Sequence, residues 1–266
     1  MRELNGAALV MTPWMQARVG ARLLLLQARW DPARMQGPGF AFAIDPWLAA
    51  CWAAEPEGLL AARRRHLQYF NTHPIAAWLT AGIVCRQEAE AAALSGASRE
   101  AVFARIHTLK TGLGAALAGL YDSFFWGALR PVSALAGILA AQAAYRLSSP
   151  HALAWAVATA LAVYNIPALT ARVLGLRRGW DNGESAPTEL TTLQIQACIL
   201  WLRRATIAGA LLAFIVSAGQ LGSDGLTAAL TFTAGLILTW RGVSPLAQLG
   251  LAGLGGMAAS AAGLWP

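Results

Sequence analysis

The chain has 266 residues, of which 57% are hydrophobic and 12% charged, and its mean hydropathy is +0.49. A soluble domain carries about 25% charged residues, so this composition excludes a disordered or collagen-like chain and predicts an integral membrane protein. Twenty basic residues against thirteen acidic ones give a net charge of +7. The cations punctuate apolar runs instead of gathering on one polar face, which is typical of cytoplasmic loops and argues against nucleic-acid binding.

The first 110 residues hold most of the charge and are expected to form cytoplasmic or interfacial amphipathic helices. Residues 14–30 are interpreted as a helix lying on the membrane, because three arginines share one of its faces at helical spacing. These arginines are Arg18, Arg22 and Arg29. An ordinary amphipathic helix of a protein core is the alternative interpretation.

Prolines divide the remainder of this region. They predict short pieces of chain up to residue 58, at Pro32, Pro38, Pro46 and Pro56. A second helix over about 59–70 must end before Pro74, since a proline disfavours helical backbone in the residue before it. The apolar residues 75–85 are too few to cross a bilayer alone, and a polar helix is expected to follow them to about Lys110.

Residues 111–266 are expected to form the transmembrane region. About twenty apolar residues cross a bilayer as a helix, and uncharged runs that approach or exceed this length cover residues 147–171, 205–223, 225–240 and 242–266. Residues 111–145 are expected to fold as a broken-helix hairpin, and the connection 172–204, with five cations, should be cytoplasmic. The predicted class is therefore an all-α, polytopic integral membrane protein with a cytoplasmic N-terminus.

The segment from His66 to Pro74 is the first candidate site. Asn71, Thr72 and His73 come where a helix must end, so backbone groups without intrahelical partners lie beside polar side chains. Broken helices near a membrane are common places for polar ligands. A capping turn, in which Asn71 and Thr72 only satisfy backbone groups, is the alternative.

Asp122 defines the second candidate site, inside an otherwise apolar segment. A carboxylate at the centre of a membrane-spanning helix costs about 2.5–3.5 kcal/mol unless it is paired or lines a polar cavity. Asp122 is therefore predicted to be functional, with a structural ion pair to Arg130 as the alternative. Asn165, two residues before Pro167, is interpreted as a packing residue at a kink, with a place in a passage as the alternative.

Motifs of covalent catalysis are missing from the sequence. It contains no glycine-rich phosphate loop followed by Lys-Ser or Lys-Thr, no paired-histidine zinc motif and no Gly-x-Ser-x-Gly serine elbow. The three cysteines, Cys51, Cys85 and Cys198, lack the spacing of metal ligands. We therefore expect no cofactor, no metal site and no covalent chemistry by this chain alone.

Five strings of the sequence carry a family resemblance, in an order and spacing that cover nearly all of the chain from about Trp14 onward. They are ARMQGPGFAFAIDP (33–46), RRRHLQYFNTHP (63–74), GLGAALAGLYDSFFWGALRP (112–131), LRRGWDNG (176–183) and TWRGVSPL (239–246). Together they resemble the IID subunit of the mannose-fructose-sorbose family of the bacterial phosphotransferase system.

The resemblance implies a subunit of a sugar permease in the bacterial inner membrane. Such a IID subunit joins a IIC subunit in a hetero-oligomer that moves a hexose across the lipid bilayer, while cytoplasmic IIA and IIB proteins relay phosphate to the sugar on their own histidines. His66 and His73 are thus implied to be structural or sugar-contacting. The motif implies a translocation region at Asn71, Thr72, His73, Asp122 and Trp126, with structural partners at His66, Tyr121 and Arg130.

Two departures from the family pattern motivate an alternative function. Tyr121 stands where the family usually has glycine before the motif aspartate. The outward-facing region between the last spans is shorter than is usual for the family. The alternative is a non-transporting membrane scaffold or regulatory subunit derived from the same family. An unrelated membrane enzyme that uses His66 or His73 with Asp122 is a third hypothesis.

Overall fold

The computed structural model describes residues 9–186 and 192–218. These residues form helices and their connections, with isolated β-bridges that join Met35 to Asp31 and to Phe70. The predicted all-α class is confirmed. A first compact unit ends at Thr206, and the described residues 207–218 belong to a second unit. The spans expected over 225–240 and 242–266, and the end of the one over 205–223, lie outside the described residues.

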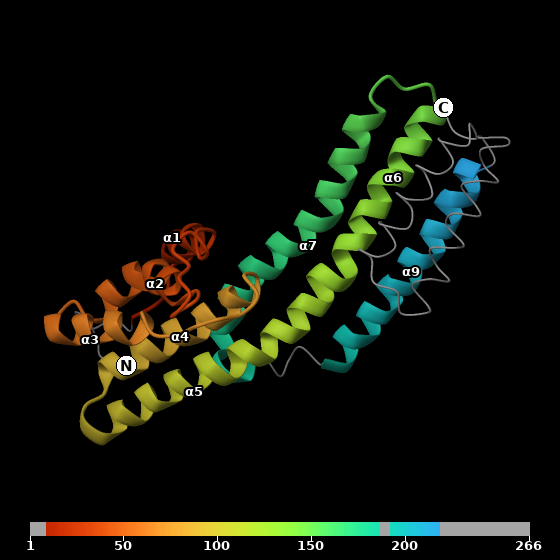
Figure 1. Cartoon of the computed structure of the whole chain (residues 1–266). Coiled ribbons are helices and arrows are strands. Elements are labelled where there is room, and N and C mark those ends of the chain that lie inside the picture. The colour runs from red at the N-terminus through yellow and green to blue at the C-terminus, as the bar shows by residue number, and fades with distance from the viewer. Residues whose placement is uncertain (1–8, 187–191, 219–266) are drawn as a thin grey trace. The chain divides into compact units, whose positions relative to one another are not determined.

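Four helices open the chain, and three of them begin with a proline in the first turn, where a missing N–H breaks no helical hydrogen bond. The four are α1 (Pro13–Leu23), α2 (Gly37–Cys51), α3 (Pro56–His66) and α4 (Ala76–Ala93) (Figure 1). The expectation of short pieces up to residue 58 is wrong, because Pro38 lies in the first turn of α2 and Pro46 is accommodated inside the same helix.

The helix expected over 14–30 ends earlier, at Leu23, and the chain continues through tight turns. Val19, Gly20 and Leu23 of α1 are buried. The apolar side chains of Trp14, Leu24, Leu25 and Trp30 are at least half exposed. One face of this segment therefore packs on the rest of the protein, and exposed apolar side chains lie outside that face. The location of the segment at the membrane surface stays a prediction.

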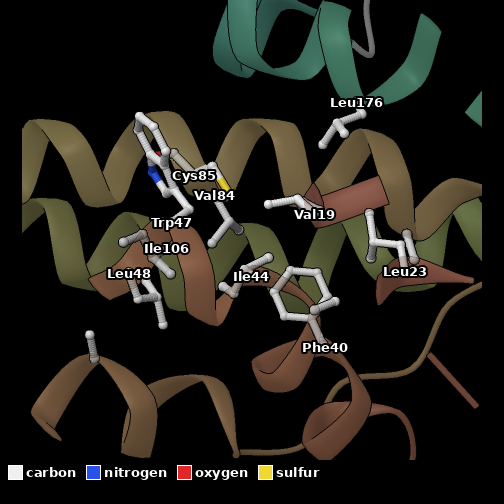
Figure 2. Packing of buried hydrophobic residues seen from close by; sticks show 14 of the residues in the cluster. Val19, Leu23, Phe40, Ile44, Trp47, Leu48, Val84, Cys85, Ile106 and Leu176 are labelled. Carbon is white, nitrogen blue, oxygen red and sulfur yellow. The ribbon is translucent and has the colours of Figure 1, made fainter. Parts of the chain in front are cut away.

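The hydrophobic core of the first unit is built around α2. Phe40, Ile44, Trp47 and Leu48 of this helix are at most 1% exposed. Side chains from five other helices complete the cluster, among them Val19, Val84, Cys85, Ile106 and Leu176 (Figure 2). The indole Nε1–H of Trp47 donates to the carbonyl of Cys85 at 2.7 Å, so the one polar atom of this large side chain is satisfied inside the core.

The hairpin expected over 111–145 is not formed. Helix α5 (Gly96–Tyr121) continues through a π-helical segment, η1 (Asp122–Leu129), into α6 (Arg130–Arg146) (Figure 1). Pro131 lies in the first turn of α6. A proline inside a helix clashes with the carbonyl four residues before it, and the wider π-helical turn ahead of Pro131 gives the chain room to absorb it. The charge and the proline therefore interrupt the α-helical geometry without reversing the chain.

Two longer expected segments are also redrawn. The apolar residues 75–85 and the first half of the polar helix are one helix, α4, and α7 (Ala152–Asn182) extends the span expected over 147–171 well into the connection 172–204. After a short 3₁₀ turn, η2 (Gly183–Ser185), α9 (Thr192–Ala218) takes up the rest of that connection. Helices α4 and α7 touch at glycines: a Cβ at Gly82 would collide with the carbonyl of Leu176, and one at Gly179 with the carbonyl of Leu79.

Among the described residues, three helices are long and apolar enough to cross a membrane. They cover Gly96–Arg146, Ala152–Ser185 and Gln194–Phe214. The expected boundary between a cytoplasmic region (1–110) and a transmembrane region (111–266) falls inside α5. That division stays a prediction, and α5 crosses it without a break.

Candidate functional site

The polar motif of residues 71–73 lies in the connection between α3 and α4, where hydrogen bonds from another part of the chain hold it. Gln36 N donates to the Phe70 carbonyl at 2.8 Å, and Phe70 N donates to the Arg34 carbonyl at 3.2 Å. The side chain of Gln36 continues this pairing to Thr72: its Nε2 donates to Thr72 O at 2.7 Å and its Oε1 accepts from Thr72 N at 3.1 Å. The motif therefore has a defined backbone although it lies between helices.

Two buried polar atoms of the motif have no hydrogen-bond partner in the described part of the chain. They are Thr72 Oγ1 and His73 Nε2. His73 Nδ1 accepts from the Ile75 amide at 3.1 Å, which places the proton of the neutral ring on Nε2. Burial lowers the pKa of His73 to about 4, with the Arg172 guanidinium as a second cause, so the ring is neutral at pH 7. Because an unpaired buried donor is costly, His73 Nε2 marks a place where a polar ligand would be stabilised.

Aromatic side chains of the long helix surround the His73 ring. Phe125 stacks on it at a centroid distance of 5.4 Å, and Trp126 meets it edge-on at 5.2 Å. Tyr121 lies on another side at 5.9 Å. The structure thus brings His73, Tyr121 and Trp126 together, as the motifs predict, although about fifty residues separate the two segments. Phe125 belongs to the same cluster and was not singled out from the sequence.

A groove of about 400 Å³ lies beside this cluster, between η1, α6 and α7. Trp126, which is 51% exposed, lines it together with Arg130, Ser133, Tyr164 and Asn165. Ser133 Oγ donates to the Arg130 carbonyl at 2.7 Å, and Asn165 Nδ2 donates to the Leu161 carbonyl at 2.9 Å. Their oxygens remain able to accept while the Arg130 guanidinium donates. The volume is within the range of about 300–1,000 Å³ of small-ligand sites.

Ser133 is therefore a groove residue that the sequence did not indicate, and Asn165 is one whose place in a passage was only the alternative. Asn165 was interpreted as a packing residue, and it lines the groove instead. Ser133 is indistinguishable from any other helical serine until α6 and α7 are placed side by side. The sequence carried a signal for Asn165, because a polar side chain inside an apolar run is costly in a membrane unless it faces the protein interior or a polar cavity.

Asp122 and Asn71 lie at the edge of this arrangement. Asp122 begins η1 and is half-buried, and its carboxylate forms no hydrogen bond or ion pair within the described residues. The ion pair with Arg130 is not formed, because the two residues lie on one continuous helix with on the order of 10 Å of axis between them. The Asn71 side chain is exposed, and its carbonyl faces Gly114 of α5.

His66 belongs to a separate cluster centred on Glu88 of α4. His66 Nε2 lies 2.8 Å from Glu88 Oε1, Arg65 Nη2 donates to both carboxylate oxygens at 2.8 and 3.0 Å, and Trp52 Nε1 donates to Oε2 at 2.9 Å. The Lys110 ammonium is 5.4 Å from the centre of the Phe40 ring. The cluster ties α3 to α4 and so supports the start and end of the connection that carries His73.

The ionisation of this cluster follows from its contacts. Burial lowers the pKa of His66 to about 4, against the opposing effect of the hydrogen bond to Glu88. Burial alone would raise the pKa of Glu88, but the hydrogen bonds and charges of His66 and Arg65 outweigh it and lower that pKa to about 2. At pH 7 Glu88 is ionised and His66 is a neutral donor. Glu88 could have been found from the sequence, since it shares a helical face with the buried Ala81, Cys85 and Ala92.

A larger groove, of about 620 Å³, lies between α3 and α5. Glu57 and Arg64 give its lining charges of both signs, and Arg65 is already paired with Glu88. The two unpartnered atoms of the polar motif are elsewhere. The candidate site is therefore the His73 cluster with the groove beside Trp126.

Comparison with known proteins adds the family. The sequence model of the PTS system mannose/fructose/sorbose family IID component matches residues 11–220. The chain belongs to this family. The predicted resemblance is thereby confirmed, and the IID-family match includes every predicted site residue.

Curated relatives match a shorter stretch. The chain is 38% identical over 113 residues to the mannose-specific EIID component of Escherichia coli (strain K12), with 42% of this chain and 38% of the relative aligned. It is 36% identical over 110 residues to the fructose permease IID component of Bacillus subtilis (strain 168), with 39% and 36% aligned. The sorbose-specific EIID component of Klebsiella pneumoniae is 33% identical over 113 residues, with 42% and 39% aligned. The matched part therefore spans less than two fifths of these relatives.

Solved structures share the fold over nearly the whole chain. One is a chain of the mannose transporter ManYZ in complex with microcin E492, with a TM-score of 0.56, 24% identity, and 96% of this chain and 98% of that chain covered. Another, described as a membrane protein, has a TM-score of 0.66, 24% identity, and 96% and 99% covered. This IID-family chain is thus an all-helical protein of the membrane.

Proposed function

We propose that this IID-family chain is a translocator subunit that moves a hexose across the bacterial inner membrane together with a IIC subunit, coupled to phosphorylation by IIA and IIB proteins. The observation that carries the proposal is the buried His73 Nε2–H, which has no partner within the described residues and is packed among the aromatic rings of η1. The relatives' names point to the same substrate class, since mannose, fructose and sorbose are all hexoses.

Each residue of the site has a role in this proposal. The half-exposed ring of Trp126 packs on the apolar face of the sugar, while Arg130, Ser133 and Asn165 exchange hydrogen bonds with its hydroxyl groups. His73 Nε2 donates to a hydroxyl. Asp122, which is ionisable and unpaired within the described residues, accepts hydrogen bonds from hydroxyls at the start of η1.

The chemistry of His73 favours sugar contact over phosphate transfer. A histidine accepts a phosphoryl group on a nitrogen lone pair, and the Nδ1 lone pair of His73 is occupied by the Ile75 amide. Burial keeps the pKa of the ring at about 4, so the ring is neutral, and its single proton is on Nε2 because Nδ1 accepts. We therefore assign the phosphoryl carriers to IIA and IIB and expect no covalent step on this chain.

The proposed assembly is a hetero-oligomer of multi-pass subunits with this chain's N-terminus in the cytoplasm. Large apolar side chains of α7 are more than half exposed along the helix, among them Leu153, Leu161 and Ile166. Such a surface fits lipid or another membrane subunit. The Arg-rich segments before residue 110 and after residue 172 support the cytoplasmic placement.

A non-transporting scaffold is the alternative, and Tyr121 is the observation that favours it. Its backbone has φ −73° and ψ −35°, ordinary right-handed helix that does not require glycine. The effect of Tyr121 is therefore the volume of its ring, which lies against His73. If that ring closes the site, the chain binds its partner without passing sugar.

Uptake of radiolabelled hexoses by cells that express the full chain with its companion subunits tests the proposal. His73→Phe keeps the ring stacking and removes the N–H, and Asp122→Asn removes the charge; both should reduce uptake at least tenfold without changing the amount of protein in the membrane. His107→Phe is the matched control, because His107 is exposed on α5. Normal uptake in His73→Phe would contradict the assigned role. Wild-type protein that takes up no hexose yet co-purifies with IIC would favour the scaffold.

A further inference from the structure

We propose that Gln36 is a positioning residue for the sugar site: its side-chain amide fixes the backbone of Thr72 and thereby the places of Thr72 Oγ1 and His73 Nε2. The inference rests on the proposed function, since it assigns a residue that acts on the hexose through others. Gln36 precedes α2, and 36 residues separate it from Thr72.

The backbone before α2 pairs with the connection after α3 as two short strands would, and the Gln36 side chain extends this pairing by one residue. Residues 34 and 36 pair with Phe70 through backbone hydrogen bonds of 3.2 and 2.8 Å. The pairing cannot continue along the backbone, because α2 begins at Gly37. The side-chain amide of Gln36 makes the next two hydrogen bonds instead, donating to the Thr72 carbonyl at 2.7 Å and accepting from the Thr72 N–H at 3.1 Å.

The chain around this contact leaves the amide little freedom. Gln36 is 3% exposed, and a Cβ at Gly37 would collide with the carbonyl of Gln68, so the two segments are in close contact. Both functional groups of the Gln36 side chain are used. An apolar side chain of the same length would leave the N–H and C=O of Thr72 buried without partners, which buried backbone groups rarely tolerate.

Loss of the Gln36 contact should reach the ligand because both unpartnered atoms are close to it in the chain. Thr72 Oγ1 and His73 Nε2 lie on the residue that Gln36 holds and on the next one. The His73 carbonyl accepts from the Ala77 amide at 3.1 Å as α4 begins, whereas the backbone N–H and C=O of Thr72 are held by the Gln36 side chain. Displacement of binding groups by about 1 Å weakens a site strongly. Loss of the amide should therefore raise the hexose KM more than it lowers the maximal rate.

The first test is the kinetics of hexose uptake by the full chain with its companion subunits. Gln36→Met, of similar length and without an amide, should raise KM about tenfold and change the maximal rate less than twofold. The matched control is Gln87→Met. Gln87 is also 3% exposed, but its Nε2 donates to Glu184 Oε1 and it lies away from the motif. An unchanged KM in Gln36→Met, or an equal rise in the control, overturns the proposal.

A second variant separates positioning from general damage to the fold. In Gln36→Glu the protonated carboxylic acid again offers one donor and one acceptor to Thr72, whereas the carboxylate only accepts. Equilibrium binding of radiolabelled hexose to membranes, expressed relative to wild type, should recover as the pH falls from about 7.5 to about 5.5, since burial raises the pKa of a carboxyl group. Gln36→Met should show no such recovery. Equal pH profiles for the two variants overturn the proposal.

These outcomes are distinct from a failure of the proposed function. If wild type transports hexose and His73→Phe does not, while Gln36→Met behaves as wild type, the function stands and the role of Gln36 is wrong. If wild type neither binds nor transports any hexose, the proposed function fails, and the positioning role fails with it.

Discussion

Tyr121 stands where the family resemblance implies a glycine, and its ring lies beside the proposed sugar site. It lies 5.9 Å from the His73 ring and 5.6 Å from that of Phe125. It also lines a mostly apolar cavity of about 290 Å³ with Phe124 and Cys198. A glycine at this position would open this space, so in the proposed transporter Tyr121 should restrict which hexose enters.

Replacement of Tyr121 by glycine tests this restriction. Tyr121→Gly should lower the KM for bulky hexose derivatives several-fold relative to the unsubstituted hexose, because the ring no longer fills the space beside His73. Competition uptake with a panel of hexoses measures the ratio. Tyr145→Gly is a control at an exposed site on α6. An unchanged ratio in Tyr121→Gly would remove Tyr121 from the determinants of specificity.

His66 and Glu88 should make the fold sensitive to acid. The pKa of His66 is about 4 in the folded protein, below its ordinary 6.5, so between these values the unfolded chain binds a proton that the folded chain does not. The free energy of unfolding therefore falls as the pH drops through this interval, by on the order of 3 kcal/mol. Glu88, with a pKa of about 2 against 4.5, continues the loss below about pH 4.5.

Thermal unfolding of the detergent-purified full chain checks this sign. The Tm should fall between about pH 7 and about pH 4.5, and His66→Gln, which retains a donor to Glu88, should make the decline shallower. His73, whose pKa is also about 4, should retain part of the decline in that variant. A Tm that rises on acidification, or an identical slope in His66→Gln, would contradict this account.

At the residue scale, the motifs singled out side chains but not the contacts they make. His73 and Trp126 were both named from the motifs and their rings are in contact in the structure, while their role in sugar binding stays a prediction. Gln36, Phe125 and Glu88 could not be paired with their partners from the sequence, since each contact joins segments that only the tertiary fold brings side by side.

At the scale of elements, the packing of α4 on α7 should be sensitive to a single substitution. Gly82 and Gly179 face each other across it, and a Cβ at either would collide with a backbone carbonyl of the other helix. Backbone cannot move aside as a flexible side chain can. The connection with His73 leads directly into α4, so this packing also supports the site.

Gly82→Ala should destabilise the protein by about 2 kcal/mol or more, through overpacking. Gly112→Ala is the matched control, because Gly112 of α5 has open space around its Cα, and alanine is favoured over glycine in a helix by about 1 kcal/mol. Thermal unfolding should show a lower Tm for Gly82→Ala and an unchanged or higher one for Gly112→Ala. Equal effects would mean that α4 and α7 do not meet at these glycines.

Interruptions inside helices are the features that the sequence predicts least well. Apolar runs predicted several of the helices, but the prolines before residue 58 were interpreted as breaks, and a charge and a proline between two runs suggested a hairpin at 111–145. The chain instead absorbs Asp122 and Pro131 in a π-helical segment, a geometry with no distinct sequence pattern. Pro46 inside α2 misled the prediction in the same way.

At the scale of the whole molecule, composition was the strongest guide. The excess of apolar over charged residues predicts a membrane protein, and three described helices have the length and hydropathy to cross a bilayer. The family match over residues 11–220 agrees with that class. What composition cannot supply is the proposed hexose site, which is built on the contact between the connection after α3 and the middle of the long helix.

Photoaffinity labelling with a diazirine-bearing hexose tests that position most directly. The full complex would be labelled in membranes, and the labelled peptides identified by mass spectrometry, with and without excess unlabelled hexose. We expect competed labelling in two peptides of this chain, one with residues 71–73 and one with residues 121–133. Competed labelling confined to the partner subunit, with none in these two segments, would contradict the account.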